Sequence, residues 1–256
     1  MTKCLNARCD KILFNRDLDK NLRVCQYCGY HFRLTAYERI AMLTDAESFV
    51  EWDSTLRAAD PLEFPRYQES LDRYRGSTGL DDAAVTGGAS VAGIPVALGI
   101  TDARFMMGSM NSVVGERLTR AAERAVDERT PLLLVSGTGG GARMHEGILS
   151  LMQMPKTTAA LGRLSRAGLL YVSLLTDPSM AGVFASWASI GDVILAEPGA
   201  MVGFAGDRVA KQGGGGGRKP TDYQTSEFQF QHGMVDAVVP RKELRATLER
   251  VLRWAS

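Results

Sequence analysis

The sequence predicts an α/β fold preceded by a small cysteine-rich domain. Segments 131–167 and 169–190 each contain a short apolar run, a turn with glycine and a helical pattern, in that order. Short apolar runs bounded by glycine are typical of buried strands. All four cysteines lie within the first 28 residues. Because 45% of the 256 residues are hydrophobic, the chain can bury one large core and carry a small appendage.

The cysteines form two close pairs, Cys4 with Cys9 and Cys25 with Cys28, in the pattern C-x4-C, fifteen residues, C-x2-C. Two such pairs are typical of a zinc ribbon, because tetrahedral Zn²⁺ needs two pairs of thiolates brought together. Four thiolates leave no open coordination position, so we expect a structural zinc site. Two alternatives are that His31 replaces Cys9 as a ligand, or that the cysteines are unrelated core residues.

Composition argues against several other classes of protein. The net charge of +1 gives no overall attraction to nucleic acid or membrane. No apolar run reaches the ~20 residues of a membrane span, and the polar N-terminus does not resemble a signal peptide. We therefore expect a cytoplasmic protein with reduced cysteines. Weak nucleic-acid binding stays open for the basic residues near the cysteines, although a solvated surface is their more ordinary role: Lys3, Arg8, Lys11, Arg16, Lys20, Arg23 and Arg33.

The elements after the cysteines are predicted from local signals. A Thr-x-x-Glu capping-box pattern predicts a helix over 35–43. The mixed segment 49–75, which contains two prolines, is expected to be a link. Alternating apolar residues predict strands within 84–101, with a hairpin turn at Gly93.

A methionine-rich loop is expected at 105–112, followed by a helix over 113–129 that Pro131 ends. The helix that begins at Met144 should kink or divide at Pro155. The elements predicted after the second turn are short strands at 190–198 and 200–206, a flexible five-glycine loop or lid at 213–217, and a helix, a strand and a terminal helix within 226–255.

The glycine-rich turn at 136–143 is the strongest candidate for chemistry. Glycine leaves its backbone N–H groups uncrowded, and the helix that follows adds unpaired donors and a positive dipole end. These features suit a phosphate, or an oxyanion that develops during a reaction. The turn at 176–182 repeats the arrangement at the same edge of the sheet. The alternative is that both turns serve only the close packing of helix on strand.

Several catalytic motifs are absent from the sequence. It contains no G-x-x-x-x-G-K-[ST] for ATP and no G-x-S-x-G nucleophile elbow, and its three histidines form no recognisable triad. The string from Gly137 to Ala142 formally matches a dinucleotide fingerprint, but the expected acidic residue about 20 positions later is missing. Backbone donors are therefore the natural catalytic groups of this chain.

A set of ordered sequence strings carries a resemblance to a known family. The strings lie at residues 33–36, 105–110, 112–116, 140–144, 149–154, 175–178, 191–192, 196–198 and 203–206. Through them the chain resembles the β subunit of bacterial acetyl-CoA carboxylase carboxyltransferase over essentially its whole length. The resemblance implies a crotonase/ClpP-like superhelix of β-β-α units over residues 34–256, preceded by the zinc ribbon at 1–33.

The resemblance also implies an activity and partners. The β subunit would hold acyl-CoA, and a separate α subunit would supply the face for carboxybiotin, which a biotin carboxyl carrier protein delivers. The carboxyl group would pass from biotin to the methyl carbon of acetyl-CoA and give malonyl-CoA, with biotin itself taking the methyl proton. A heterotetramer of two α and two β subunits is expected.

The resemblance assigns roles to particular residues. In the family, backbone N–H groups of a glycine pair stabilise the thioester enolate. The pair corresponds to Gly140 and Gly141, and Gly182 is a weaker candidate. Cofactor and substrate binding would fall to Ala142, Arg143, Phe204 and Gly206.

The chain departs from the usual pattern of the family near the expected substrate clefts. The first cysteine pair has a wider spacing and the glycine turn is one residue longer, while Asn111, Pro155 and Ala181 replace the usual residues. A different acyl-CoA substrate is therefore kept as an alternative. So is a biotin-independent decarboxylase of a malonyl thioester, because its reaction passes through the same enolate.

Overall fold

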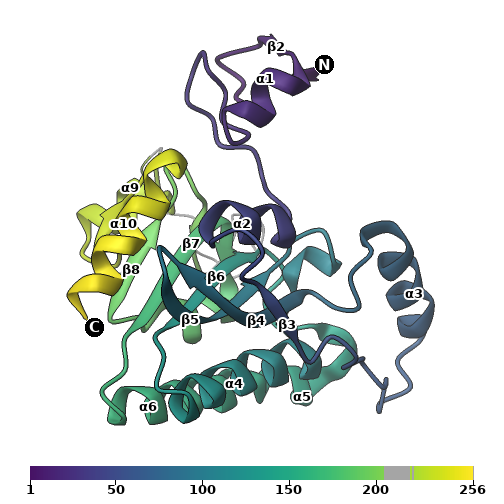
Figure 1. Cartoon of the computed structure of the whole chain (residues 1–256). Coiled ribbons are helices and arrows are strands. Elements are labelled where there is room, and N and C mark those ends of the chain that lie inside the picture. Colours follow the sequence, from purple (N-terminus) through teal and green to yellow (C-terminus); the bar gives the residue numbers. More distant parts are fainter. Residues whose placement is uncertain (205–219, 221, 256) are drawn as a thin grey trace.

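The computed structural model describes residues 1–204, 220 and 222–255, and it consists of a small N-terminal lobe and a larger mixed α/β body (Figure 1). The predicted α/β class is therefore confirmed. Among the described residues, no helix combines the length and the apolarity that a membrane crossing needs. The lobe contains β1 (Thr2–Lys3), β2 (Ile12–Leu13) and α1 (Asn15–Lys20).

One sheet forms the centre of the body. Its strands follow the order β10-β8-β7-β6-β5-β4-β3, and β9 pairs with β7 beside this path. The pairs β3–β4 and β4–β5 are antiparallel, whereas the other pairs are parallel. The strands are β3 (Val50–Trp52), β4 (Ala84–Val91), β5 (Ile94–Thr101), β6 (Leu132–Thr138), β7 (Tyr171–Met180), β8 (Val193–Ala196), β9 (Val202–Gly203) and β10 (Ala237–Val238).

Helices cover both faces of this sheet. Helices α4 and α6 pack against each other and on strands β4 to β7, while α2 and α10 lie on the other side of the sheet (Figure 1). The helices of the body are α2 (Ala36–Leu43), α3 (Tyr67–Thr78), α4 (Ser112–Asp127), α5 (Gly147–Leu151), α6 (Gln153–Arg166), α7 (Ala181–Phe184), α9 (Ser226–Gln231) and α10 (Arg241–Trp254), with short 3₁₀ turns η1 (Met106–Gly108), η2 (Met144–Glu146) and η3 (Trp187–Ser189).

Local signals account for several of these elements. The Thr35 side chain accepts a hydrogen bond from the Glu38 N–H, and the Glu38 carboxylate accepts one from the Thr35 N–H, so the predicted capping box begins α2. The predicted hairpin is also confirmed. Strands β4 and β5 pair in continuous antiparallel register around Ala92 and Gly93, whose φ angles of 52° and 79° suit a tight hairpin turn.

The predictions for segment 49–75 and for the helix around Pro155 were wrong in part. Segment 49–75 is more than a link, because it contains β3 and most of α3, a polar and largely exposed helix without a strong apolar face. The chain does divide near Pro155, but the break falls before Gln153. Pro155 lies in the first turn of α6, where a backbone N–H has no intrahelical acceptor and a missing one costs nothing.

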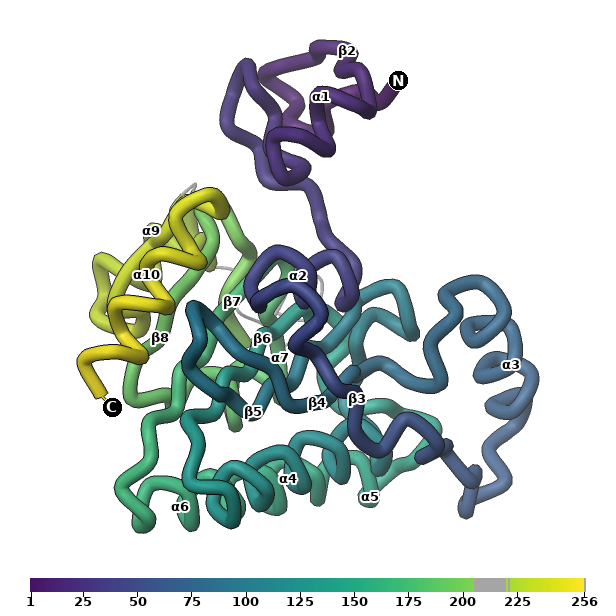
Figure 2. Tube along the Cα trace, in the orientation of Figure 1, coloured from purple at the N-terminus to yellow at the C-terminus, as the bar shows by residue number. Residues whose placement is uncertain are grey.

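The second predicted turn is also different in the structure. Strand β7 continues through most of segment 176–182, because Ser179 and Met180 pair with β9. The helix expected over 183–190 is a single turn of α7 followed by η3. Helix α7 packs against the end of β7 and against β9 (Figure 2). The five-glycine loop predicted at 213–217 lies outside the described residues.

A buried ion cluster joins α2, α10 and the end of β8. The Glu197 carboxylate accepts paired hydrogen bonds from Arg39, at 3.1 and 3.2 Å, and from Arg241, at 2.7 and 2.8 Å. Arg241 also donates to the Leu22 carbonyl of the lobe at 2.8 Å. Burial opposes the charge of Glu197, but the two guanidinium groups outweigh it and lower its pKa to about 2. The cluster therefore ties three parts of the chain together through one carboxylate.

Replacing Glu197 with glutamine should destabilise the fold by about 3–5 kcal/mol at neutral pH, because two buried guanidinium groups lose their counter-charge. A depressed folded-state pKa stabilises the protein above the unfolded pKa, and this contribution is lost as the pH falls toward about 2. The difference in unfolding free energy between wild type and variant should therefore shrink below about pH 4. Urea denaturation of both proteins from neutral to acidic pH measures this difference. A difference that does not change with pH would contradict the ion pairing of Glu197 with Arg39 and Arg241.

Candidate active site and metal centre

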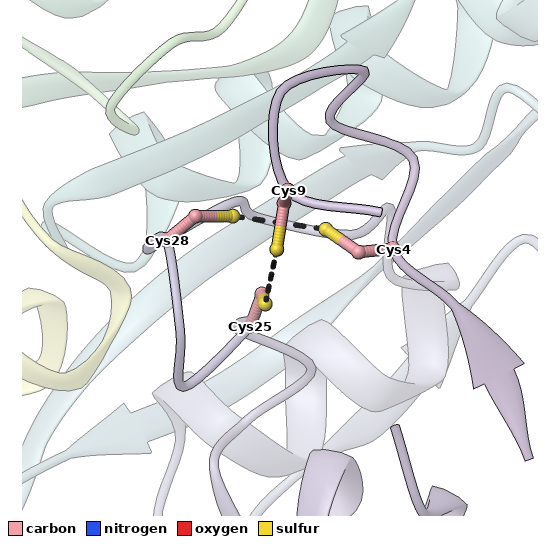
Figure 3. Close-up of side chains that lie close together, drawn as sticks. All are labelled: Cys4, Cys9, Cys25 and Cys28. Atoms are coloured by element: carbon pink, nitrogen blue, oxygen red, sulfur yellow. Dashed lines mark hydrogen bonds between the residues drawn. The ribbon is translucent and has the colours of Figure 1, made fainter. Parts of the chain in front are cut away.

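The four cysteines converge in the N-terminal lobe. Their sulfur atoms all lie within 4.8 Å of one another and point toward a common centre (Figure 3). The Sγ–Sγ distances are 3.7 Å for Cys4 and Cys28, and 3.9 Å for Cys9 and Cys25. A tetrahedron with Zn–S bonds of about 2.3 Å has edges of about 3.8 Å. The donor set and its geometry therefore fit a four-coordinate metal ion.

The surroundings of the sulfur atoms agree with a structural site. Burial raises the pKa of the Cys4 thiol to about 12, whereas at Cys25 burial is outweighed by backbone and thiol hydrogen bonds, which lower the pKa to about 7. Cysteine binds a metal as the thiolate, so binding of an ion at this cluster would release protons. His31 is not part of the cluster, and its Nε2 instead accepts a hydrogen bond from the Arg241 N–H. Of the basic residues that surround the cysteines, Lys3, Arg23 and Arg33 pair with carboxylates. The lobe has its own small core, which includes Leu13, Leu18 and Phe32.

The double substitution of Cys25 and Cys28 with serine should abolish binding of one zinc ion per chain, because it removes two of the four thiolates. It should loosen residues 1–33 while the sheet of the body stays folded, since the lobe and the body bury separate clusters. Metal analysis and hydrogen exchange of the two parts would measure both effects. A full zinc content in the double variant would contradict the assignment of the ligands.

The first glycine turn follows β6 and is held by hydrogen bonds to the methionine-rich loop. The N–H groups of Gly139 and Gly140 both donate to the Met107 carbonyl, at 2.9 and 3.0 Å. The Gly140 N–H, which was expected to face a substrate, is therefore engaged within the fold. Met107 has a left-handed φ of 58°, which the sequence did not indicate.

The next residues of this turn are fixed by a short parallel bridge. The Met110 N–H donates to the Gly141 carbonyl at 2.7 Å, and the Arg143 N–H donates to the Met110 carbonyl at 2.8 Å. In a parallel bridge the residue between these two bonds directs its own N–H to the opposite side. The N–H groups of Gly141 and Ala142 have no acceptor among the residues that the structure describes.

The second turn faces the first across a short distance. A Cβ placed on Gly182 would lie 3.9 Å from the Ala142 nitrogen, and one placed on Gly141 would lie 3.8 Å from the Gly182 nitrogen. Gly182 is the second residue of α7, and first-turn N–H groups lack intrahelical acceptors. Gly141 has a φ of +59°, and a Cβ there would lie 2.9 Å from the Ala181 Cβ. Two sets of backbone donors therefore meet where little room remains for side chains.

An open cavity of about 700 Å³ adjoins the two turns. Of the residues predicted to bind substrate or cofactor, Ala142 and Phe204 line it, together with Gly182. Gly206 lies outside the described residues. Arg143 does not line the cavity, because its side chain is buried and forms an ion pair with Asp82. The remaining wall is mostly apolar: Leu151, Met154, Pro155, Thr158, Ala159, Ala185 and Ser186.

The chain has the sequence of a carboxyl transferase domain. Residues 31–229 match the family model described as a carboxyl transferase domain. Within this class, similar curated relatives are named acetyl-coenzyme A carboxylase carboxyl transferase subunit beta. The relative from Pelotomaculum thermopropionicum is 53% identical over 98% of this chain and 87% of its own length, and that from Desulforamulus reducens is 52% identical over 98% and 85%. The chain belongs to this family of carboxyl transferase beta subunits.

Solved structures share the fold. The crystal structure of transcarboxylase 12S matches with a TM-score of 0.75 and 24% identity, over 86% of this chain and 41% of that chain. A Pseudomonas malonate decarboxylase hetero-dimer matches with a TM-score of 0.69 and 24% identity, over 86% of each chain. At these identities the likeness concerns the fold alone, and it confirms the predicted crotonase-like carboxyl transferase architecture.

Proposed function

We propose that this chain is the acyl-CoA half of a carboxyl transferase that moves a carboxyl group from carboxybiotin to acetyl-CoA. The observation that supports it best is the pair of facing turns, in which Gly141, Ala142 and Gly182 have backbone N–H groups without acceptors among the described residues. Such donors stabilise an oxyanion when they are held in place before the reaction. The thioester of an acyl-CoA supplies that oxyanion, because loss of a methyl proton forms an enolate.

The residues of this chain would position the substrate rather than exchange protons with it. The thioester oxygen would accept hydrogen bonds from Ala142 and Gly182, and Gly141 would leave room for the acyl group. The apolar cavity wall would exclude water from the methyl carbon. Carboxybiotin, when bound, supplies the carboxyl group, and biotin takes the methyl proton. The buried Arg143 would support the turn, and Phe204, which is 65% exposed at the cavity, would contact acyl-CoA or biotin.

The proposal includes partners. Large apolar side chains lie exposed on η2, α5 and the α5–α6 junction, beside the cavity: Met144, Ile148, Leu149, Leu151 and Met152. We assign this surface to an α subunit, which would close the site over biotin in a heterotetramer of two α and two β chains. The carrier of biotin would be a separate biotin carboxyl carrier protein, the cysteine cluster would hold zinc, and the complex would act in the cytoplasm.

The function can be tested with purified subunits. The chain mixed with its α subunit should transfer the carboxyl group of malonyl-CoA to free biotin, and the chain alone should not. Release of CO₂ from malonyl-CoA at the same rate without biotin would overturn the proposal and favour the decarboxylase. Transfer of comparable rate by the chain alone would refute the need for the α subunit.

The Gly141→Ala variant should lose roughly 10²–10³ in turnover, because its side chain would displace the backbone donors of the turn. Gly168→Ala is a matched control, since Gly168 also has a left-handed φ, of +69°, but lies in open space between α6 and β7. Both variants should lose about 1–2 kcal/mol of stability, because alanine is strained in this conformation. Thermal unfolding and turnover of the complex separate the two effects. Equal turnover in the two variants would show that the catalytic centre does not include the turn at Gly141.

A further inference from the structure

A buried polar network lies directly behind the first glycine turn, and Arg143 is its one member that the function proposed above names. At its centre is Arg143, whose Nη1 and Nη2 donate to the Asp82 carboxylate at 3.2 and 2.8 Å. Its Nε donates to the Ser109 hydroxyl at 3.0 Å, and its Nη2 also donates to the Ser109 carbonyl at 3.0 Å. Its Nη1 donates to the Tyr67 hydroxyl at 3.2 Å. The guanidinium group therefore has no donor left for a ligand in the cavity.

The network continues to a second buried carboxylate. Glu146 accepts hydrogen bonds from the Tyr67 hydroxyl at 2.9 Å, from the Asn111 side-chain amide at 3.1 Å and from the Ser112 N–H at 2.8 Å. The same Asn111 amide donates to Asp82 at 3.0 Å, so it bridges the two carboxylates. Each of the side chains that form the network is at most 5% exposed: Tyr67, Asp82, Ser109, Asn111, Arg143 and Glu146.

The charged groups of the network have their partners within the fold. One guanidinium group faces two carboxylates, but Glu146 also lies at the first N–H group of the 16-residue helix α4, whose positive dipole end offsets part of the second charge. Burial raises the pKa of Tyr67 to about 12, so its hydroxyl stays neutral and donates to Glu146 across the physiological range. Losing one partner would leave a buried charge without compensation, so the network is restricted to one arrangement.

The network holds the turn from several directions. Its members come from the start of α3, the segment just before β4, the loop before α4, the turn itself and η2. Arg143 is the residue after Ala142, and its main chain closes the bridge to Met110 while its side chain enters the network. A displacement of the guanidinium group would therefore move the peptide groups that carry the unpaired donors.

We propose that this network is the positioning device of the oxyanion hole, and that Tyr67, Ser109 and Asp82 act on the reaction through Arg143. The inference rests on the function proposed above, because it names the groups that hold the donors of that site. It predicts a loss of turnover with little change in substrate affinity. Contacts that only stabilise the fold would leave the turnover per folded complex unchanged.

The test compares two buried tyrosines in the complex with the α subunit. Tyr67→Phe removes a hydroxyl from the network. Tyr171→Phe also removes a buried hydroxyl, which donates to the Trp187 carbonyl at 2.6 Å. Tyr171 begins β7, so it lies at the end of that strand away from the candidate site. Both should lower the melting temperature slightly. Only Tyr67→Phe should lower kcat per folded complex with malonyl-CoA and free biotin, by about tenfold, with KM changed less than about twofold. Tenfold in rate corresponds to about 1.4 kcal/mol, the order of one hydrogen bond between the Tyr67 hydroxyl and the charged Arg143.

Two further variants cover other outcomes. Ser109→Ala removes only the acceptor of the Arg143 Nε and should give a smaller loss of kcat, so it serves if Tyr67→Phe folds poorly. Arg143→Lys should cost about 10² in kcat, the order expected for a displacement of about 1 Å. Folded Tyr67→Phe and Ser109→Ala complexes with wild-type kcat would overturn the positioning role. A wild-type complex without biotin-dependent transfer would instead overturn the proposed function.

Discussion

The parallel bridge between Met110 and Ala142 is the constraint on which the candidate site depends. Its two backbone hydrogen bonds fix the peptide planes of the turn and direct the N–H group of Ala142 away from Met110. The Ala142 nitrogen lies close to Gly182, because a Cβ placed on Gly182 would be 3.9 Å from it. A turn made largely of glycine has no side chains to hold its own shape. Its conformation therefore has to come from the loop before α4, which binds it, and from the buried network behind it.

The two buried arginine clusters have different roles. The cluster around Glu197 lies between helices and reaches a carbonyl of the N-terminal lobe, so it concerns the stability of the whole chain. The cluster around Arg143 lies next to the donors of the turn, so it concerns the geometry of the site. In both, the cost of burying a charge is offset by bidentate hydrogen bonds, the arrangement in which arginine is most effective.

Much of the fold could be predicted because its signals are local. The capping box at Thr35, the hairpin at Gly93 and the apolar face of α4 each depend on residues within a few positions of one another. Helix α3 was missed because it is polar and exposed. The extension of β7 was missed because the pairing that creates it comes from β9, more than twenty residues further along the chain.

The sequence by itself determined the family, the cluster of four cysteines and the glycine-rich turn after β6, because cysteine spacing, glycine content and ordered strings are local properties of a chain. Only the tertiary structure decided which donors in the first turn are free. The Gly140 N–H is taken by Met107, whereas the Ala142 N–H is not taken by any described residue. Tyr67, Asp82 and Glu146 likewise meet only on folding. Hydrogen bonds between residues distant in sequence make these choices, and no local pattern encodes them.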